Sequence, residues 1–280
     1  MAAEIAYLGP PGTFGEQAAL LYRRLSGLEA ELRPLATNAA VVRAVEAREA
    51  SHGVVPVENS LEGAVTESLD AMLTAPGVWV CAELALPVEH HLIAAPGTHL
   101  EAVSIVMSHP QALAQCRGFL KERLPRARLD AALSTAAAVE EAVRTPGAAA
   151  IGTRRAAELH GGVVLAETIQ DEKENHTRFL ALSGADSPPT GDDKTSIAFA
   201  VDHARPGTLI AALRELSERQ INMTHIQLRP SRKGLGLYVF LIDFQGHRTE
   251  ANVAEALQAM AAQCSFLRIL GSYPRFDEGL

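Results

Sequence analysis

Short apolar runs that end in glycine, proline, serine or threonine recur along the first part of the chain, and a helical pattern follows each of them. Such runs occupy residues 5–8, 53–57, 103–107, 129–133 and 148–151. An apolar run of this length between turn residues is typical of a buried strand. The repeated order of strand, tight turn and helix predicts an α/β fold, with a mainly parallel sheet and helices on its faces.

Two other apolar stretches break this rhythm. The strands expected between residues 78 and 94 are less clearly followed by helices, and we expect them to carry a crossover between two lobes. Residues 177–182 predict one more strand, with no helix after it. Residues 184–194 are then polar, rich in proline and glycine and without periodicity, so they predict a linker.

Residues 195–280 follow a different pattern. It predicts a strand, an amphipathic helix, two strands joined by a glycine-rich hairpin around Lys233 and Gly234, a second helix and a final strand. This βαββαβ order is the ferredoxin-like motif. Because so small a sheet leaves one face and an edge exposed, we expect the protein to associate through them as a homodimer or homotetramer.

Composition narrows the possible partners. The 280 residues carry a net charge of −8, which argues against nucleic acid or an anionic membrane as a partner. No apolar run approaches the roughly 18 to 20 residues of a membrane span, and no secretory signal pattern is visible. The three cysteines are far apart and predict reduced thiols in a cytoplasmic protein. Neither cysteines nor histidines show a metal-binding spacing, so no metal site is expected.

The turns after the predicted strands form the candidate site. Parallel sheets bind ligands at the carboxyl ends of their strands, and the free N–H groups of helix N-termini can bind an anion. Taken singly, Ser60, Ser108, Thr135 and Thr153 are best explained as helix N-caps, worth about 1 kcal/mol each. Taken together, one hydroxyl on nearly every turn predicts a polar pocket.

Four segments carry more specific motifs: Gly9-Pro10-Pro11-Gly12-Thr13-Phe14, residues 55–63 (Val-Pro-Val-Glu-Asn-Ser-Leu-Glu-Gly), Ser108-His109-Pro110-Gln111 with Gln115-Cys116, and Asn175-His176-Thr177-Arg178-Phe179. In this order, and across the whole chain, they resemble the motifs of the prephenate dehydratase family. The Pro-Val-Glu-Asn-Ser and Thr-Arg-Phe segments are quite specific. Residues 221–224 and 229–232 resemble the amino-acid-sensing ACT domain of the same family.

The resemblance implies a two-lobed catalytic domain (residues 1–183), folded like type-2 periplasmic binding proteins with its site in the cleft, and a ferredoxin-like ACT regulatory domain (195–280). Lobe one would comprise about 1–78 and 168–183, and lobe two about 79–167. The implied reaction converts prephenate to phenylpyruvate, with loss of water and carbon dioxide, in phenylalanine biosynthesis and without cofactor or metal. Arogenate dehydratase is a neighbouring alternative, and a non-catalytic amino-acid sensor is an alternative of another class.

Thr177 is the position that the resemblance marks as essential. Because its hydroxyl is a poor acid, we interpret it as a hydrogen-bond donor to the departing oxygen. Glu58 is a stronger acid, although its ordinary role would be favourable charge at the start of a helix. The identity of the proton donor therefore stays open. The other candidates are mostly polar or glycine residues of the motif turns: Asn59 and Gln115 as catalytic, and Gly12, Thr13, Ser60, Ser108, Gln111, Ser134, Thr135, Asn175, Arg178 and Phe179 as substrate-binding.

Two features of these motifs qualify the candidates. Strand alternation puts Arg178 on the face opposite Thr177 and Phe179, so it either anchors a substrate carboxylate or pairs with an acidic residue. The first motif usually continues with serine after Phe14, whereas this chain has Gly15.

The C-terminal part departs from the family at the presumed effector site. The family's Glu-Ser-Arg-Pro is Gln-Leu-Arg-Pro here (227–230), and its Gly-Ala-Leu-Val is Gly-Thr-Leu-Ile (207–210). The resemblance predicts an amino-acid effector, aromatic in the family. Because a carboxylate and a hydroxyl are lost, the identity of the effector stays open, with regulation by another amino acid and weak regulation as alternatives. The effector-binding candidates are Gly207, Thr208, Leu209, Asn222, Met223, Gln227, Leu228, Arg229 and Pro230.

Overall fold

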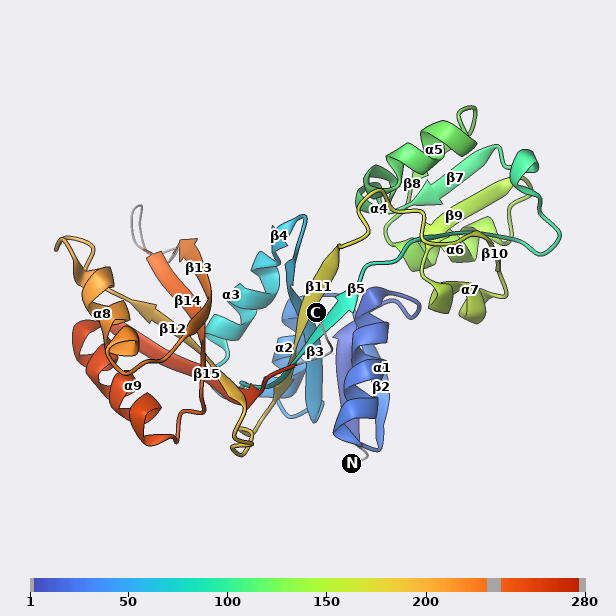
Figure 1. Cartoon of the computed structure of the whole chain (residues 1–280). Coiled ribbons are helices and arrows are strands. Elements are labelled where there is room, and N and C mark those ends of the chain that lie inside the picture. The colour runs from blue at the N-terminus through green and yellow to red at the C-terminus, as the bar shows by residue number, and fades with distance from the viewer. Residues whose placement is uncertain (1–2, 231–237, 277–280) are drawn as a thin grey trace.

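The computed structural model describes residues 3–230 and 238–276 and arranges them around three β-sheets in a row (Figure 1). Lobe one lies in the middle, between lobe two and the C-terminal domain. Two mixed sheets joined by two crossovers give the two-lobed α/β arrangement expected of a type-2 periplasmic-binding-protein fold. Within these residues, no helix is both long and apolar enough to cross a membrane.

Lobe one is built on a sheet of strand order β2-β1-β3-β11-β5, with the short β4 beside β3. The first three strands along this path are parallel, and β11 runs antiparallel to both its neighbours. The strands are β1 (Ala3–Leu8), β2 (Ala30–Leu35), β3 (His52–Asn59), β4 (Gly63–Ala64), β5 (Trp79–Pro87) and β11 (His176–Ser183), and the helices are α1 (Phe14–Ser26), α2 (Asn38–Glu46) and α3 (Thr66–Thr74).

Lobe two has the strand order β10-β6-β9-β7-β8, with β7 parallel to β8 and β9, and β6 antiparallel to β9 and β10. The prediction of a mainly parallel sheet therefore holds where a helix follows each strand, and is wrong for strands that connect the lobes. Its elements are β6 (His91–Ala94), η1 (Leu100–Ala102), β7 (Ile105–Ser108), α4 (Pro110–Gln115), α5 (Arg117–Arg123), β8 (Arg128–Ala131), α6 (Thr135–Ala142), β9 (Ala148–Gly152), α7 (Arg154–His160) and β10 (Val163–Ala166).

The boundary between the lobes differs from the expectation. All of β5 pairs with β11 in the first sheet, so lobe two begins after Pro87 rather than near residue 79. On the return, the Ile169 N–H donates to the His90 carbonyl and the Asp171 N–H to the Gln115 carbonyl. Residues 168–171 therefore still pack against lobe two, and the second crossover follows them.

The C-terminal domain confirms the predicted βαββαβ order, with a sheet of order β13-β14-β12-β15. The predicted hairpin around Lys233 and Gly234 lies outside the described residues. Strand β13 forms an edge of the sheet, where Ile226 and Leu228 are exposed. The elements are β12 (Asp193–Ala200), α8 (Thr208–Ser217), β13 (Met223–Pro230), β14 (Tyr238–Gln245), α9 (Ala251–Gln263) and β15 (Phe266–Pro274).

Apolar packing joins the C-terminal domain to lobe one. The helices α8 and α9 cover one face of its sheet, while Ala198, Leu241 and Leu270 on the other face share a hydrophobic cluster with side chains of α2 and α3. Arg268 donates to backbone carbonyls at the end of α3, among them those of Met72 and Leu73. The two domains therefore form one packed unit.

Gly271 packs tightly against lobe one, because a Cβ there would overlap the backbone oxygen of Val80 in β5. We predict that Gly271→Ala lowers the free energy of unfolding by about 1–3 kcal/mol, the usual cost of overpacking. Urea unfolding measures the change. Gly184→Ala is the matched control, because a Cβ at Gly184 meets no atom within 4 Å. Equal stability of the two variants would contradict the tight docking.

Candidate active site

A cleft of about 630 Å³ lies between the two lobes. Lobe one contributes the ends of β1, β3 and β11 and the start of α1, and lobe two contributes α4 and the start of α6. Of the predicted site residues, this cleft brings together Thr13, Asn59, Gln111, Gln115, Ser134, Thr135, Thr177 and Phe179. These residues come from five separate segments, but of the four turn hydroxyls from which a polar pocket was predicted, only that of Thr135 lines the cleft.

Thr177 is oriented by a chain of buried amides. Asn59 Nδ2 donates to Thr177 Oγ1 at 2.9 Å and to Asn175 Oδ1 at 2.9 Å. The Asn59 Oδ1 accepts the N–H groups of Leu61 and Glu62, which fixes the orientation of the amide. Because the Thr177 oxygen already accepts a hydrogen bond, its hydroxyl hydrogen remains to be donated to a ligand.

Glu58 lies on the other face of the sheet. Arg178 pairs with Glu58 but Phe179 pairs with Pro56, so Val57 is an extra residue and forms a β-bulge. The bulge reverses the alternation, and it puts Asn59 in the cleft while Glu58 approaches His225 of the C-terminal domain at 3.7 Å. Glu58 therefore does not lie where its expected catalytic role would require.

Arg178 also faces away from the cleft. Its guanidinium forms ion pairs with Glu83 of β5 at 3.0 Å and with Asp243 of β14 at 2.7 Å. Of the two roles expected for this arginine, pairing with acidic residues is the one that the structure contains. The nearby carboxylates keep the guanidinium charged, because they raise its pKa although burial acts in the opposite direction.

His90 was not among the predicted site residues, although it lines the cleft beside Gln115. Its Nε2 lies 3.0 Å from Gln115 Oε1, and its ring makes a T-shaped contact with Phe14 of lobe one at 5.7 Å between centroids. Burial lowers the pKa of His90, which favours the neutral imidazole. The sequence signal was weak, because a histidine pair at the start of a strand has no motif of its own.

The cleft offers an anion no lysine or arginine side chain among the described residues that line it. None of the described residues that line it is Asp, Glu, Lys or Arg. Two helices from opposite lobes, α1 and α6, instead start at its edge, and helix N-termini carry unpaired N–H groups and partial positive charge. The Thr13 hydroxyl does not cap α1 but donates to the carbonyls of Leu8 and Pro10, whereas Ser134 caps α6 by accepting from the Ala137 N–H. Gly15 fits here because a Cβ would lie 2.6 Å from the Leu8 oxygen.

The remaining substrate candidates, and the turn hydroxyl of Thr153, have structural partners. Thr153 caps α7 and donates to the carbonyl of Gly12, which joins the two lobes. Ser108 is fully buried and donates to the Ile151 carbonyl, so it is not an N-cap. Ser60 likewise does not cap a helix, since its oxygen accepts the His176 N–H and its hydroxyl donates to Asn175 Oδ1. Asn175 thereby supports the Asn59 amide from behind the cleft.

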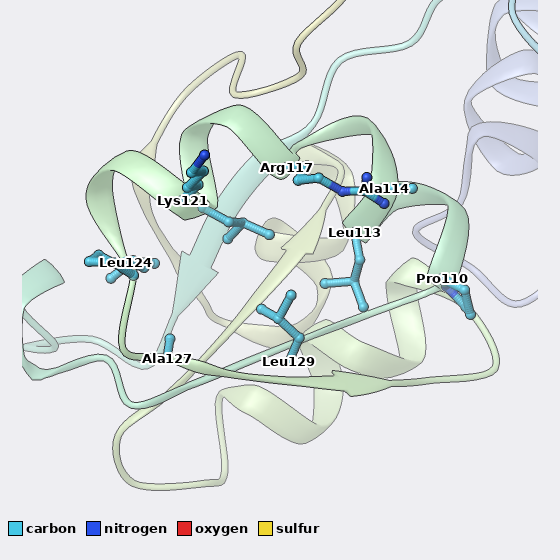
Figure 2. Close-up of a pocket in the computed structure, with 10 residues that line it drawn as sticks. Pro110, Leu113, Ala114, Arg117, Lys121, Leu124, Ala127 and Leu129 are labelled. Carbon is cyan, nitrogen blue, oxygen red and sulfur yellow. The ribbon is translucent and has the colours of Figure 1, made fainter.

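Figure 2 shows a second hollow, on lobe two between α4, α5 and β8. Its volume is about 460 Å³, and apolar side chains such as Leu113 and Leu124 line it, with Arg117 and Lys121 at its edge. None of the predicted site residues is among the described residues that line this hollow. The cleft between the lobes, which eight of the predicted site residues line, is the candidate active site.

The effector candidates lie in two parts of the C-terminal domain. Gly207, Thr208 and Leu209 form the start of α8, where Gly207 adopts a φ of 82°. Asn222 directly precedes the edge strand β13, and the others lie along it, from Met223 to Pro230. Arg229 there pairs with Asp70 of α3 at 2.7 Å, so one effector candidate is held by the catalytic domain.

Comparison with known proteins follows the same division of the chain. A family model described as prephenate dehydratase matches residues 5–187, and an ACT domain model matches residues 201–262. The chain belongs to the prephenate dehydratase family. It is a prephenate dehydratase domain followed by an ACT regulatory domain.

Individual relatives agree over nearly the whole chain. The bifunctional chorismate mutase/prephenate dehydratase of Aquifex aeolicus is 42% identical over 97% of this chain and 74% of its own length. The prephenate dehydratase of Mycolicibacterium vanbaalenii is 38% identical over 98% of this chain and 91% of its own. The crystal structure of the Arthrobacter aurescens enzyme in complex with L-Phe superposes with a TM-score of 0.87 at 35% identity, over 98% of this chain and 90% of that chain.

Acidification should destabilise the cleft through His90. A pKa lowered by burial means that the folded chain binds fewer protons than the unfolded chain once the pH falls below about 6.5. The contribution of neutral His90 to the free energy of unfolding is therefore fully present above that pH and is lost below it. The loss is at most about 1.4 kcal/mol for each unit by which the fold lowers the pKa. We predict that His90→Gln weakens the loss of stability between pH 7.5 and 5.5 in urea unfolding.

The exposed His99 provides the matched control. The variant His99→Gln should keep the pH dependence of the parent protein. If His90→Gln also kept it, the histidine would not be held neutral by the fold.

Proposed function

We propose that this cleft converts prephenate to phenylpyruvate, with Thr177 as the hydrogen-bond donor to the departing hydroxyl. The observation that carries the proposal is the 2.9 Å hydrogen bond from Asn59 to Thr177, because an oxygen that accepts this bond keeps its own hydrogen for donation to a ligand. Family membership supports the reaction, and this geometry supports the role of the residue.

The reaction requires the protein mainly to position the substrate. Prephenate loses its ring carboxylate as carbon dioxide, the electrons of that bond move through the ring, and the ring hydroxyl leaves and becomes water with one added proton. The ring gains aromaticity, so the driving force is already in the substrate. Holding the two ends of the substrate and stabilising the leaving oxygen are therefore the main tasks, and general acid help is typically worth about 10² to 10⁴ in rate.

The cleft suits a substrate that carries carboxylates and a ketone. The starts of α1 and α6 offer N–H groups from opposite lobes, while Phe14 and Phe179 provide apolar walls for the ring. The amide of Gln115 is one of the neutral donors. Arogenate differs from prephenate by an ammonium group, and among the described lining residues no carboxylate is present to pair with it. This observation favours prephenate over arogenate.

Direct turnover tests the proposal. The purified protein should convert prephenate to phenylpyruvate, followed by absorbance in alkali, and should prefer prephenate when arogenate competes. We predict that Thr177→Val, which keeps the shape of the side chain, lowers kcat by about 10² or more, while Thr177→Ser keeps most of the activity.

The two substitutions separate chemistry from folding, because both preserve the strand. Turnover by Thr177→Val at the rate of the parent would contradict the role of the hydroxyl. Ligand binding by the parent without any turnover would favour the sensor alternative.

We further propose that an amino acid, aromatic in kind, regulates this activity through the ACT domain. The Arthrobacter aurescens relative was crystallised with L-Phe, which supports phenylalanine as the first compound to test. The candidate positions lie at the start of α8 and along β13, the open edge of the ACT sheet among the described residues. This exposed edge also supports association into a homodimer or homotetramer.

Activity measured during titration with L-phenylalanine, tyrosine and tryptophan tests the regulation. Because Gln227 and Leu228 replace a carboxylate and a hydroxyl, we predict that L-phenylalanine binds about tenfold or more weakly to this protein than to its Gln227→Glu/Leu228→Ser variant, since one lost charge-assisted hydrogen bond costs about 1.5–3 kcal/mol. Calorimetry measures both affinities. Equal affinities would mean that these positions do not contact the effector.

A further inference from the structure

Strands β3 and β11 present one row of residues to the catalytic cleft and the neighbouring row to the ACT domain. In the paired register, Thr177 lies opposite Asn59 and Arg178 lies opposite Glu58. Asn59 and Thr177 line the catalytic cleft, whereas Glu58 and Arg178 line a cavity of about 320 Å³ between lobe one and the ACT domain. Each cleft residue is therefore the direct chain neighbour of a residue that faces the regulatory domain.

The ACT domain holds both of these residues through side-chain contacts. Asp243 of β14 pairs with Arg178 at 2.7 Å, and Arg178 also donates to the Tyr273 hydroxyl of β15 at 3.2 Å. His225 of β13 approaches Glu58 at 3.7 Å. Three different ACT strands thus contact two adjacent positions behind the Asn59–Thr177 hydrogen bond.

The arginine is fixed within a buried network. Its exposed side-chain fraction is 19%, and those of Glu83 and Asp243 are 7% and 9%. Ser196 of β12 donates to Asp243 Oδ1 at 2.6 Å and lies 2.7 Å from the Tyr273 hydroxyl. A shift of β14 or β15 therefore changes the position of Arg178 rather than being absorbed by solvent.

The adjoining cavity leaves room for such a shift. Glu58, Arg178, Lys194 and His225 all border it, so the contact between the ACT sheet and the ends of β3 and β11 is incomplete. By contrast, the docking at Gly271 and β5 is too close for even one added methyl group. The ACT sheet is therefore tightly packed against β5 at Gly271 and loosely packed against the ends of β3 and β11.

We propose that Arg178 and Glu58 are positioning residues, through which the ACT sheet sets the geometry of the Asn59–Thr177 pair. The ACT domain is then part of what makes the cleft active, even without an effector, and any effector that moves β13 or β14 acts on the same two strands. This inference rests on the proposed reaction at Thr177.

The variant Asp243→Asn tests the coupling, because it removes one negative charge beside Arg178 at a position outside the cleft, while an amide oxygen can still accept from Ser196. We expect kcat to fall at least about fivefold, the lower end of typical couplings between sites, with KM changed less than about twofold. Calorimetric titration with phenylpyruvate counts the competent sites, so that kcat is expressed per site and a partly unfolded sample is not mistaken for a slow enzyme.

The variant Asp70→Asn is the matched control. It also weakens an ion pair between lobe one and β13, but through α3 rather than through β3 or β11, and its kcat should equal that of the parent. If Asp243→Asn and Asp70→Asn have the same kcat per site, the inference is overturned.

If Asp243→Asn does not fold, His225→Gln provides the test instead. His225 is partly exposed and is not part of the ion network around Arg178. A lower kcat than that of Asp70→Asn supports the inference, and an equal kcat overturns it. A parent protein that binds phenylpyruvate but does not turn over prephenate would instead refute the proposed function.

Discussion

The identity of the side chains in the cleft depends on one extra residue in β3. Regular alternation would put Glu58 beside Pro56 in the cleft and Asn59 on the opposite face, with Val57. The bulge at Val57 exchanges them. An amide therefore meets Thr177 instead of a carboxylate. A carboxylate at that distance could only accept the threonine hydrogen and would repel a dianion, whereas the Asn59 amide donates to the threonine oxygen and leaves its hydrogen for the substrate.

The same strands separate neutral from charged chemistry. On the cleft side, substrate charge meets helix N-termini and amides. On the ACT side, Arg178, Glu83, Lys194 and Asp243 form paired charges at the domain interface. Removing one partner of such a buried pair typically costs about 3–5 kcal/mol, although the intact pair adds little net stability over apolar packing. We therefore expect this charge network to act on the docking position of the ACT sheet, because a shifted sheet would leave some of these charges unpaired.

Much of this molecule follows from sequence pattern. The turns at Thr13, Ser134 and Thr135 and the strand that carries Thr177 were predicted with their neighbours, because local apolar runs and turn residues determine them. The strand Trp79–Pro87 was assigned to the wrong lobe, since strand pairing between distant segments leaves no local signal. Glu58 was expected in the cleft for a related reason: a bulge depends on the register between β3 and β11, which residue types alone do not specify. The role of Arg178 stayed undecided because its partners lie 95 residues before it and in a different domain.

The Asn59–Thr177 pair also lies next to the two crossovers that connect the lobes. Asn175 accepts from Asn59 and sits at the end of one crossover, and its backbone carbonyl accepts the N–H of Val88, which begins the other. Both crossovers are therefore tied together directly behind the cleft. Closure of the lobes around a substrate would act on Asn59 through Asn175, while the ACT sheet acts on its neighbour Glu58 and on Arg178. On this proposal, substrate binding and regulation reach the same hydrogen bond from opposite faces of one sheet, since Asn59 and Thr177 are the chain neighbours of Glu58 and Arg178.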